Sequence, residues 1–251
     1  MECKNCENYF EGNFCNSCGQ NIRVDKLTLK NFTQELSDSI FQINHGLFYT
    51  LKSLFSKPGH AIRGFLNGQR KVHFKPIAYV LVLSTFYYLI TEVFETNNLV
   101  DDFMGGVNNA REERSDSVQE VPILNWFSDN FAYAILLLIP FFSIGSYISF
   151  INRGYNYLEH IVINSYITGQ QIIFYSILTI IGVLAGNIDK MITFAIVISV
   201  IYRFWTFMQF FQDKNRIKVG IRLLLSYLLF YIILTLIMGI GTVFYLLIKK
   251  H

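Results

Sequence analysis

A series of long apolar runs between Pro76 and Ile248 constrains this chain most strongly. Each run has about 20 residues, which is the length that a helix needs to cross a hydrocarbon core of ~30 Å. Only 16% of all residues are charged, whereas soluble domains carry about a quarter. Because backbone groups inside a bilayer must be hydrogen-bonded within their own segment, the runs are predicted to be helices. The sequence therefore predicts an all-α integral membrane bundle.

About five transmembrane helices are predicted within a membrane domain that covers residues 76–251. The spans are residues 76–94, 131–151, 161–185, 191–211 and 223–248. A long acidic loop, residues 95–130, separates the first two spans, and the other connections are short.

All four cysteines lie in the first 21 residues, in the pattern C-x2-C-x8-C-x2-C: Cys3, Cys6, Cys15 and Cys18. This segment is polar and has no apolar run like that of a signal peptide, so we expect it to stay in the reducing cytosol. Paired cysteine knuckles there favour a metal over disulfides, and four thiolates complete the tetrahedron of a structural zinc site. We predict a small N-terminal zinc ribbon with zinc as cofactor. A redox dithiol, a disulfide pair and an iron–sulfur cluster are the alternatives.

Residues 22–75 are predicted to connect the ribbon to the membrane domain. Apolar side chains recur every three or four positions from Leu29 to Leu54, which predicts an amphipathic cytosolic helix over about 29–55. That helix packs on the bundle or lies in the membrane interface. Basic residues that precede the first span are expected to contact lipid headgroups: Arg63, Arg70, Lys71 and Lys75. The ribbon itself has no excess of basic residues, which argues against nucleic acid as a partner.

The distribution of basic residues predicts the orientation. They are dense before the first span and again between residues 213 and 222, whereas the acidic loop has only Arg111 and Arg114. By the positive-inside rule, the N-terminus is then cytosolic and, after five spans, the C-terminus lies outside. The final Lys249-Lys250 pair fits this orientation less well.

Several polar residues lie inside the predicted spans, where ionisable groups are costly and usually have partners. The candidate intramembrane site consists of residues from the third and fourth spans: Glu159, His160, Asn164, Gln170 and Arg203. An ion pair between Glu159 and Arg203 is the expected contact. Three interpretations stay open: a polar cavity for a headgroup, ion or substrate, a clamp that packs helices together, or an Arg203 side chain that extends to the membrane interface.

Three segments resemble a bacterial membrane-protein family known as domain of unknown function 3667. They are Cys3-Lys-Asn-Cys6 with Gly12-Asn-Phe-Cys15-Asn-Ser-Cys18-Gly19-Gln20, Pro58-Gly59 with Arg63 and Gly68-Gln-Arg70 ahead of Pro76, and Tyr157-Leu-Glu159-His160. The chain departs from this pattern at Glu7, where a glycine is often expected. The resemblance implies a zinc ribbon on a multi-span domain in the bacterial cytoplasmic membrane, and it implies no activity.

Three functions are compatible with these features. The first is a non-enzymatic adaptor or scaffold, whose ribbon recruits a cytosolic protein to the bilayer. The second is a transporter or channel component, which would need to form a homo-oligomer because five spans are few. The third is an intramembrane lipid-modifying enzyme that uses Glu159, His160 and Arg203. The sequence leaves enzymatic activity open, but it contains no recognisable catalytic motif and favours the first function.

Overall fold

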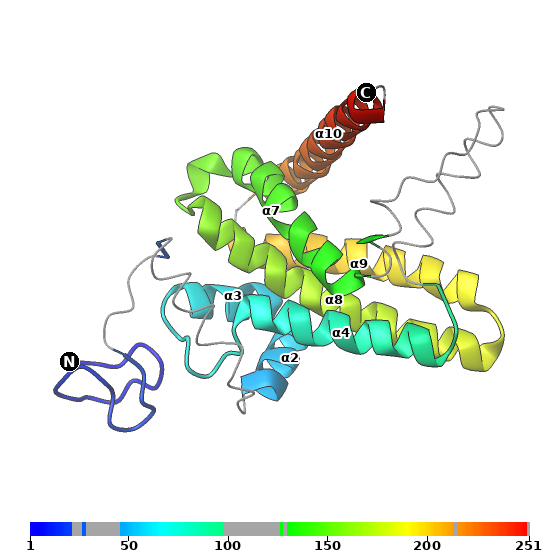
Figure 1. Ribbon diagram of the computed structural model, residues 1–251. Helices are drawn as coiled ribbons and strands as arrows, with labels where there is room; N and C mark the ends of the chain where they lie inside the picture. Colours follow the sequence, from blue (N-terminus) through cyan, green and yellow to red (C-terminus); the bar gives the residue numbers. More distant parts are fainter. Residues whose placement is uncertain (22–26, 29–45, 98–125, 128–129, 213–214, 250–251) are drawn as a thin grey trace.

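The computed structural model shows an all-helical architecture (Figure 1). It describes residues 1–21, 27–28, 46–97, 126–127, 130–212 and 215–249. The helices of this described part are α2 (Gly46–Ser56), α3 (Pro58–Leu66), α4 (Pro76–Val93), α7 (Phe131–Ser149), the short 3-10 helix η1 (Ile151–Arg153), α8 (Tyr157–Ala185), α9 (Ile188–Phe211) and α10 (Arg216–Lys249). In the cysteine segment there are only two isolated β-bridges.

Five of these helices are long and apolar enough to cross a membrane: α4, α7, α8, α9 and the segment Arg216–Ile237 of α10. Five candidate spans, the predicted number, and the all-α class are confirmed, and the chain is an integral membrane protein. The acidic loop lies almost entirely outside the described residues.

Helix α8 lies at the centre of the bundle and packs against α4, α7 and α9. It begins at Tyr157, four residues before the predicted span, because Asn156 and Glu159 form a capping box. The Asn156 side chain accepts a hydrogen bond from the backbone N–H of Glu159 (2.9 Å), and the Glu159 carboxylate accepts one from the backbone N–H of Asn156 (2.7 Å). Together they satisfy donors at the helix start that would otherwise be unpaired.

The segment before α4 contains an element that the sequence did not indicate. Pro58 does not only end the preceding helix; it stands at the start of α3, where its missing N–H is not needed. Helix α3 packs against α9, and α2 packs against α3 and α8. The described part of the predicted amphipathic helix therefore lies on the bundle, while residues 29–45 are outside the described residues.

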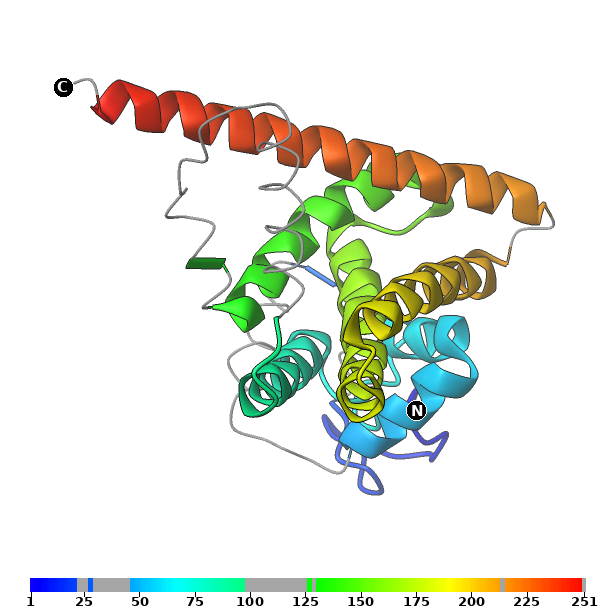
Figure 2. The same ribbon diagram turned by 90° about the vertical axis from the view of Figure 1, so that its right-hand side faces the viewer.

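Helix α10 runs across α4 and α8 rather than alongside them (Figure 1 and Figure 2). In Figure 2, α4 and α8 are strongly foreshortened, whereas α10 is seen along its length. It packs mainly on α7, and its first turns also contact α9. Gly145 permits this crossing, since a Cβ atom there would lie 2.6 Å from the carbonyl oxygen of Ser226.

Candidate metal centre and intramembrane polar cluster

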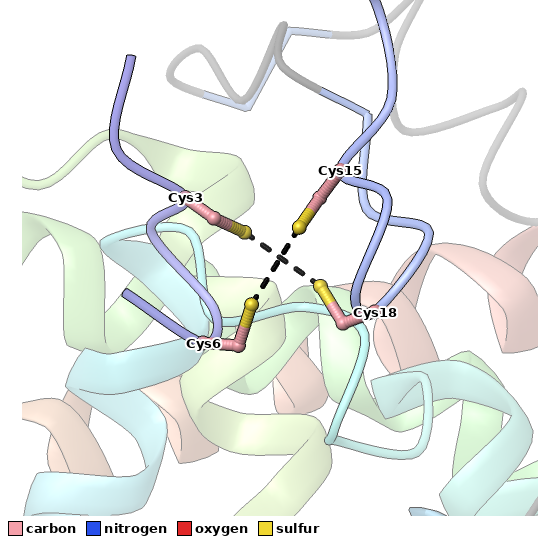
Figure 3. Close-up of side chains that lie close together, drawn as sticks. All are labelled: Cys3, Cys6, Cys15 and Cys18. Carbon is pink, nitrogen blue, oxygen red and sulfur yellow. Dashed lines mark hydrogen bonds between the residues drawn. The ribbon is translucent and has the colours of Figure 1, made fainter. Parts of the chain in front are cut away.

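The four cysteine sulfurs converge on one point, as Figure 3 shows. All four lie within 4.8 Å of one another. The Sγ atoms of Cys3 and Cys18 are 3.6 Å apart, and so are those of Cys6 and Cys15. A tetrahedron with metal–sulfur bonds of ~2.3 Å has edges of ~3.8 Å. The arrangement therefore fits one metal ion with four thiolate ligands.

Two similar turns present these sulfurs. The backbone N–H of Glu7 donates to the carbonyl of Cys3, and that of Gly19 donates to the carbonyl of Cys15, both at 2.8 Å. Both residues that end the turns have left-handed backbones, with φ of 60° at Glu7 and 70° at Gly19. The departure noted at Glu7 thus places a side chain where the turn favours glycine.

The environment of Cys15 favours its thiolate form. The backbone N–H groups of Cys18 and Ser17 lower the pKa of Cys15 to about 6, against the ordinary value of 9.0. A thiolate is the form that binds a metal, and Cys15 is the cysteine that favours it, whereas burial and the other three thiols raise the pKa of Cys6 to about 12. Phe10 packs with Cys3 and Cys15 in a minimal core beneath the site.

Arg203 is the centre of a second, intramembrane cluster. Its Nη1 donates to Asn164 Oδ1 (3.1 Å) and its Nη2 donates to Gln171 Oε1 (2.7 Å), both on α8. The guanidinium carbon lies 4.2 Å from the centroid of the Phe142 ring on α7 and 5.9 Å from that of Tyr227 on α10. Arg203 is 6% exposed. Its charge is stabilised by amide dipoles and aromatic faces, all of them neutral.

The cluster continues from Asn164 toward α7. The amide nitrogen of Asn164 donates to Ser146 Oγ (2.9 Å) and Ser143 Oγ (3.2 Å). Ser146 Oγ in turn lies 3.0 Å from Nδ1 of His160, which is fully buried. Within the described residues, His160 Nε2 and Arg203 Nε have no hydrogen-bond partner. We call these residues, with Gln171, the Arg203 cluster.

Two residues of the predicted intramembrane site lie elsewhere. The expected ion pair between Glu159 and Arg203 is wrong, because the Glu159 carboxylate caps the start of α8. Gln170 points toward α4, where its Oε1 accepts from the hydroxyl of Tyr79 (2.8 Å). Gln171 belongs to the polar face of the third span, but it is not among the residues of the predicted site. Its spacing of seven from Asn164 places both on one helix face, and this signal was available in the sequence.

The basic residues before α4 have different surroundings. Arg63 donates from Nη1 to the carbonyl of Phe210 (3.0 Å), at the C-terminal end of α9. This interaction stabilises a helix end and uses one of the Arg63 donors, and the headgroup contact of Arg63 stays a prediction. Arg70 lies with its guanidinium carbon 5.9 Å from the Phe65 ring centroid. Lys71 is exposed and Lys75 half-buried, and their lipid contacts remain predictions.

These features define a class: a helical integral membrane protein with an N-terminal four-cysteine site that could hold a metal ion. Residues 45–88 match the model of a family described as a protein of unknown function (DUF3667). The match confirms the family resemblance and covers α2, α3, the following loop and the first part of α4. The cysteines and the Tyr157-Leu-Glu159-His160 segment lie outside the matched residues. No curated protein and no solved structure matches the chain.

Proposed function

We propose that this protein is a non-enzymatic membrane adaptor whose zinc ribbon, residues 1–21, recruits a cytosolic protein to the bacterial cytoplasmic membrane. The observation that carries the proposal is a four-cysteine site on a module that exposes aromatic side chains. Four thiolates fill the coordination positions of zinc and leave none for a substrate, so the metal has a structural role. The basic residues ahead of α4 support a cytosolic ribbon.

The ribbon offers a surface for a partner. Tyr9 is 75% exposed and Phe14 is 62% exposed, although Phe10 between them in sequence is buried. Aromatic residues are enriched in protein–protein interfaces, because they bury a large area with few rotatable bonds. Two such side chains on a 21-residue module favour recognition of an apolar groove on a folded partner.

The test compares proteins that are captured by cross-linking in intact cells and then purified with the membrane-inserted chain. In a Tyr9→Ser/Phe14→Ser variant, the captured amount of a specific partner is expected to fall at least about tenfold. Cys15→Ser is expected to lose both the metal and the partner. Phe48→Ser is the control, since Phe48 is an exposed aromatic residue on α2. An unchanged set of partners in both ribbon variants, with normal insertion, would count against the adaptor.

A transporter or channel component is the second candidate, and the Arg203 cluster favours it. A guanidinium that is buried among neutral partners retains its positive charge and would attract an anion inside the membrane. Chloride and phosphate flux in proteoliposomes tests this candidate. An anion flux in the wild type that is absent in Arg203→Leu would support transport. If the wild type carries neither chloride nor phosphate, transport of these two anions is rejected. The enzyme alternative loses support, because the Glu159 carboxylate is engaged as a helix cap.

A further inference from the structure

The cysteine segment is hydrogen-bonded to the loop that leads into the first span, residues 67–75. Gln20 makes three of these contacts. Its Nε2 donates to the carbonyl of Gly68 (2.7 Å), and its Oε1 accepts from the backbone N–H groups of Arg70 and Lys71 (3.2 Å each). Gln20 is 6% exposed, so the contact is sealed from solvent. A glutamine that is buried among backbone groups holds one specific loop conformation.

A second contact comes from the other knuckle. The Oδ1 of Asn5 accepts a hydrogen bond from the backbone N–H of Val72 (3.2 Å). Asn5 lies inside the first Cys-x2-Cys knuckle, and Gln20 closely follows the second. The carbonyl of Gln20 also accepts from the backbone N–H of Cys15 (2.9 Å). Each half of the metal site therefore carries one side chain that binds the loop.

The far end of the same loop is fixed to the bundle. The backbone N–H of Phe74 donates to Thr50 Oγ1 on α2, and the carbonyl of Phe74 accepts from the hydroxyl of Tyr166 on α8, both at 2.7 Å. Pro76, two residues later, begins α4. The loop thus connects the ribbon on one side with three helices on the other.

We infer that metal binding at the four cysteines controls the docking of the ribbon on residues 67–75, and thereby the conformation of the segment that enters α4. This inference deepens the proposed function, because it names how the same ribbon is regulated. A module of this size buries too little apolar surface to fold without its metal. Without the metal the two knuckles separate, and Asn5 and Gln20 can no longer bind the loop together.

Hydrogen–deuterium exchange of the full chain in detergent micelles tests the inference. The amides of Lys71 and Val72 are the reporters, since their described acceptors are Gln20 and Asn5. Removal of the metal with a chelator is expected to speed their exchange at least about tenfold. Gln20→Ala is expected to do the same while the metal stays bound. Asn13→Ala is the matched control, because Asn13 is an exposed ribbon amide, and it should leave the exchange unchanged.

Unchanged exchange at Lys71 and Val72 after complete metal loss would overturn the inference, as would unchanged exchange in metal-bound Gln20→Ala. If Gln20→Ala itself lost the metal, Asn5→Ala would decide, since it removes only the contact with Val72. This inference and the proposed adaptor function can fail independently. Partner capture depends on Tyr9 and Phe14, and amide exchange in the loop is measured without any partner.

Discussion

Arg203 depends on neutral partners, and Asn164 is the partner that joins it to the rest of the cluster. Asn164→Ala would remove an acceptor from a buried cation and a donor from Ser146. A hydrogen bond to a charged group contributes about 2 kcal/mol, so we expect a loss of that size in unfolding free energy. Thermal unfolding in detergent would measure it. Asn152→Ala makes the same change at an exposed position and should be nearly neutral.

The two residues that end the cysteine turns should respond in opposite directions. At Gly19 the backbone is left-handed and an added Cβ atom would have no neighbour within 4 Å, so Gly19→Ala adds backbone strain alone. That strain of about 1–2 kcal/mol should weaken metal retention roughly five- to thirtyfold. Glu7→Gly should relieve the same strain and retain the metal more tightly, by a smaller factor because glycine is more disordered when unfolded. Competition with a chromogenic chelator measures both, and equal retention in both variants would contradict the interpretation.

His73 should make stability depend on pH. Burial lowers its pKa from 6.5 to about 4, and its ring packs between Tyr49, Phe65 and Tyr166. Between these pH values the unfolded chain binds more protons than the folded one, so stability falls as pH falls from 6.5 to 4. By pH 5, the free energy of unfolding is expected to have fallen by about 2 kcal/mol. Between pH 7.5 and pH 5, the unfolding temperature of His73→Gln should fall less steeply than that of the wild type. If the two proteins gave parallel curves of unfolding temperature against pH, this role of His73 would be refuted.

At the scale of elements, the contact between α3 and α9 depends on Gly59. A Cβ atom there would lie 2.4 Å from the backbone nitrogen of Phe210, and backbone cannot yield as a flexible side chain does. Gly59→Ala should therefore push α3 from α9 and lower stability by about 1–3 kcal/mol. Gly220→Ala is the control, because its nearest atom would be 3.9 Å away, on Phe204. If both variants unfolded at the wild-type temperature, the close approach of α3 to α9 would be wrong.

The spanning helices could be predicted because length and hydropathy are local properties of the chain. Helix α3 could not, since its nine residues mix apolar and basic side chains and its stability comes from packing on α9. The capping role of Glu159 was readable from Asn156, three residues earlier.

The partners of Arg203 required tertiary structure. Glu159 was the natural choice by charge, but its carboxylate is engaged at the start of its own helix. The structure instead places Asn164 and Gln171, which carry no charge, beside the guanidinium. The convergence of the cysteines followed from their spacing, whereas the docking role of Gln20 did not, because its partners lie about fifty residues away.

At the scale of the whole molecule, α10 differs from the other spanning helices in its length and direction relative to the bilayer. Its 34 residues give a length of ~51 Å, which exceeds a hydrocarbon core of ~30 Å. Helices that are too long for the bilayer tilt, and α10 does run across α4 and α8 rather than beside them (Figure 2). The basic residues of its first two turns, Arg216, Lys218 and Arg222, would then anchor its start at the cytosolic surface.

If α10 is steeply tilted but still crosses the bilayer, the C-terminus lies outside the cytosol. A C-terminal alkaline phosphatase fusion, which is active only outside, should be active, and a C-terminal green fluorescent protein fusion should stay dark. Fusions after Gln212, between α9 and α10, are the control and should show the opposite pattern, because the basic residues that follow favour the cytosol. A fluorescent C-terminal fusion with that control intact would mean that α10 lies along the membrane without crossing it. The number of crossings would then be even, and the C-terminal Lys249-Lys250 pair would be cytosolic.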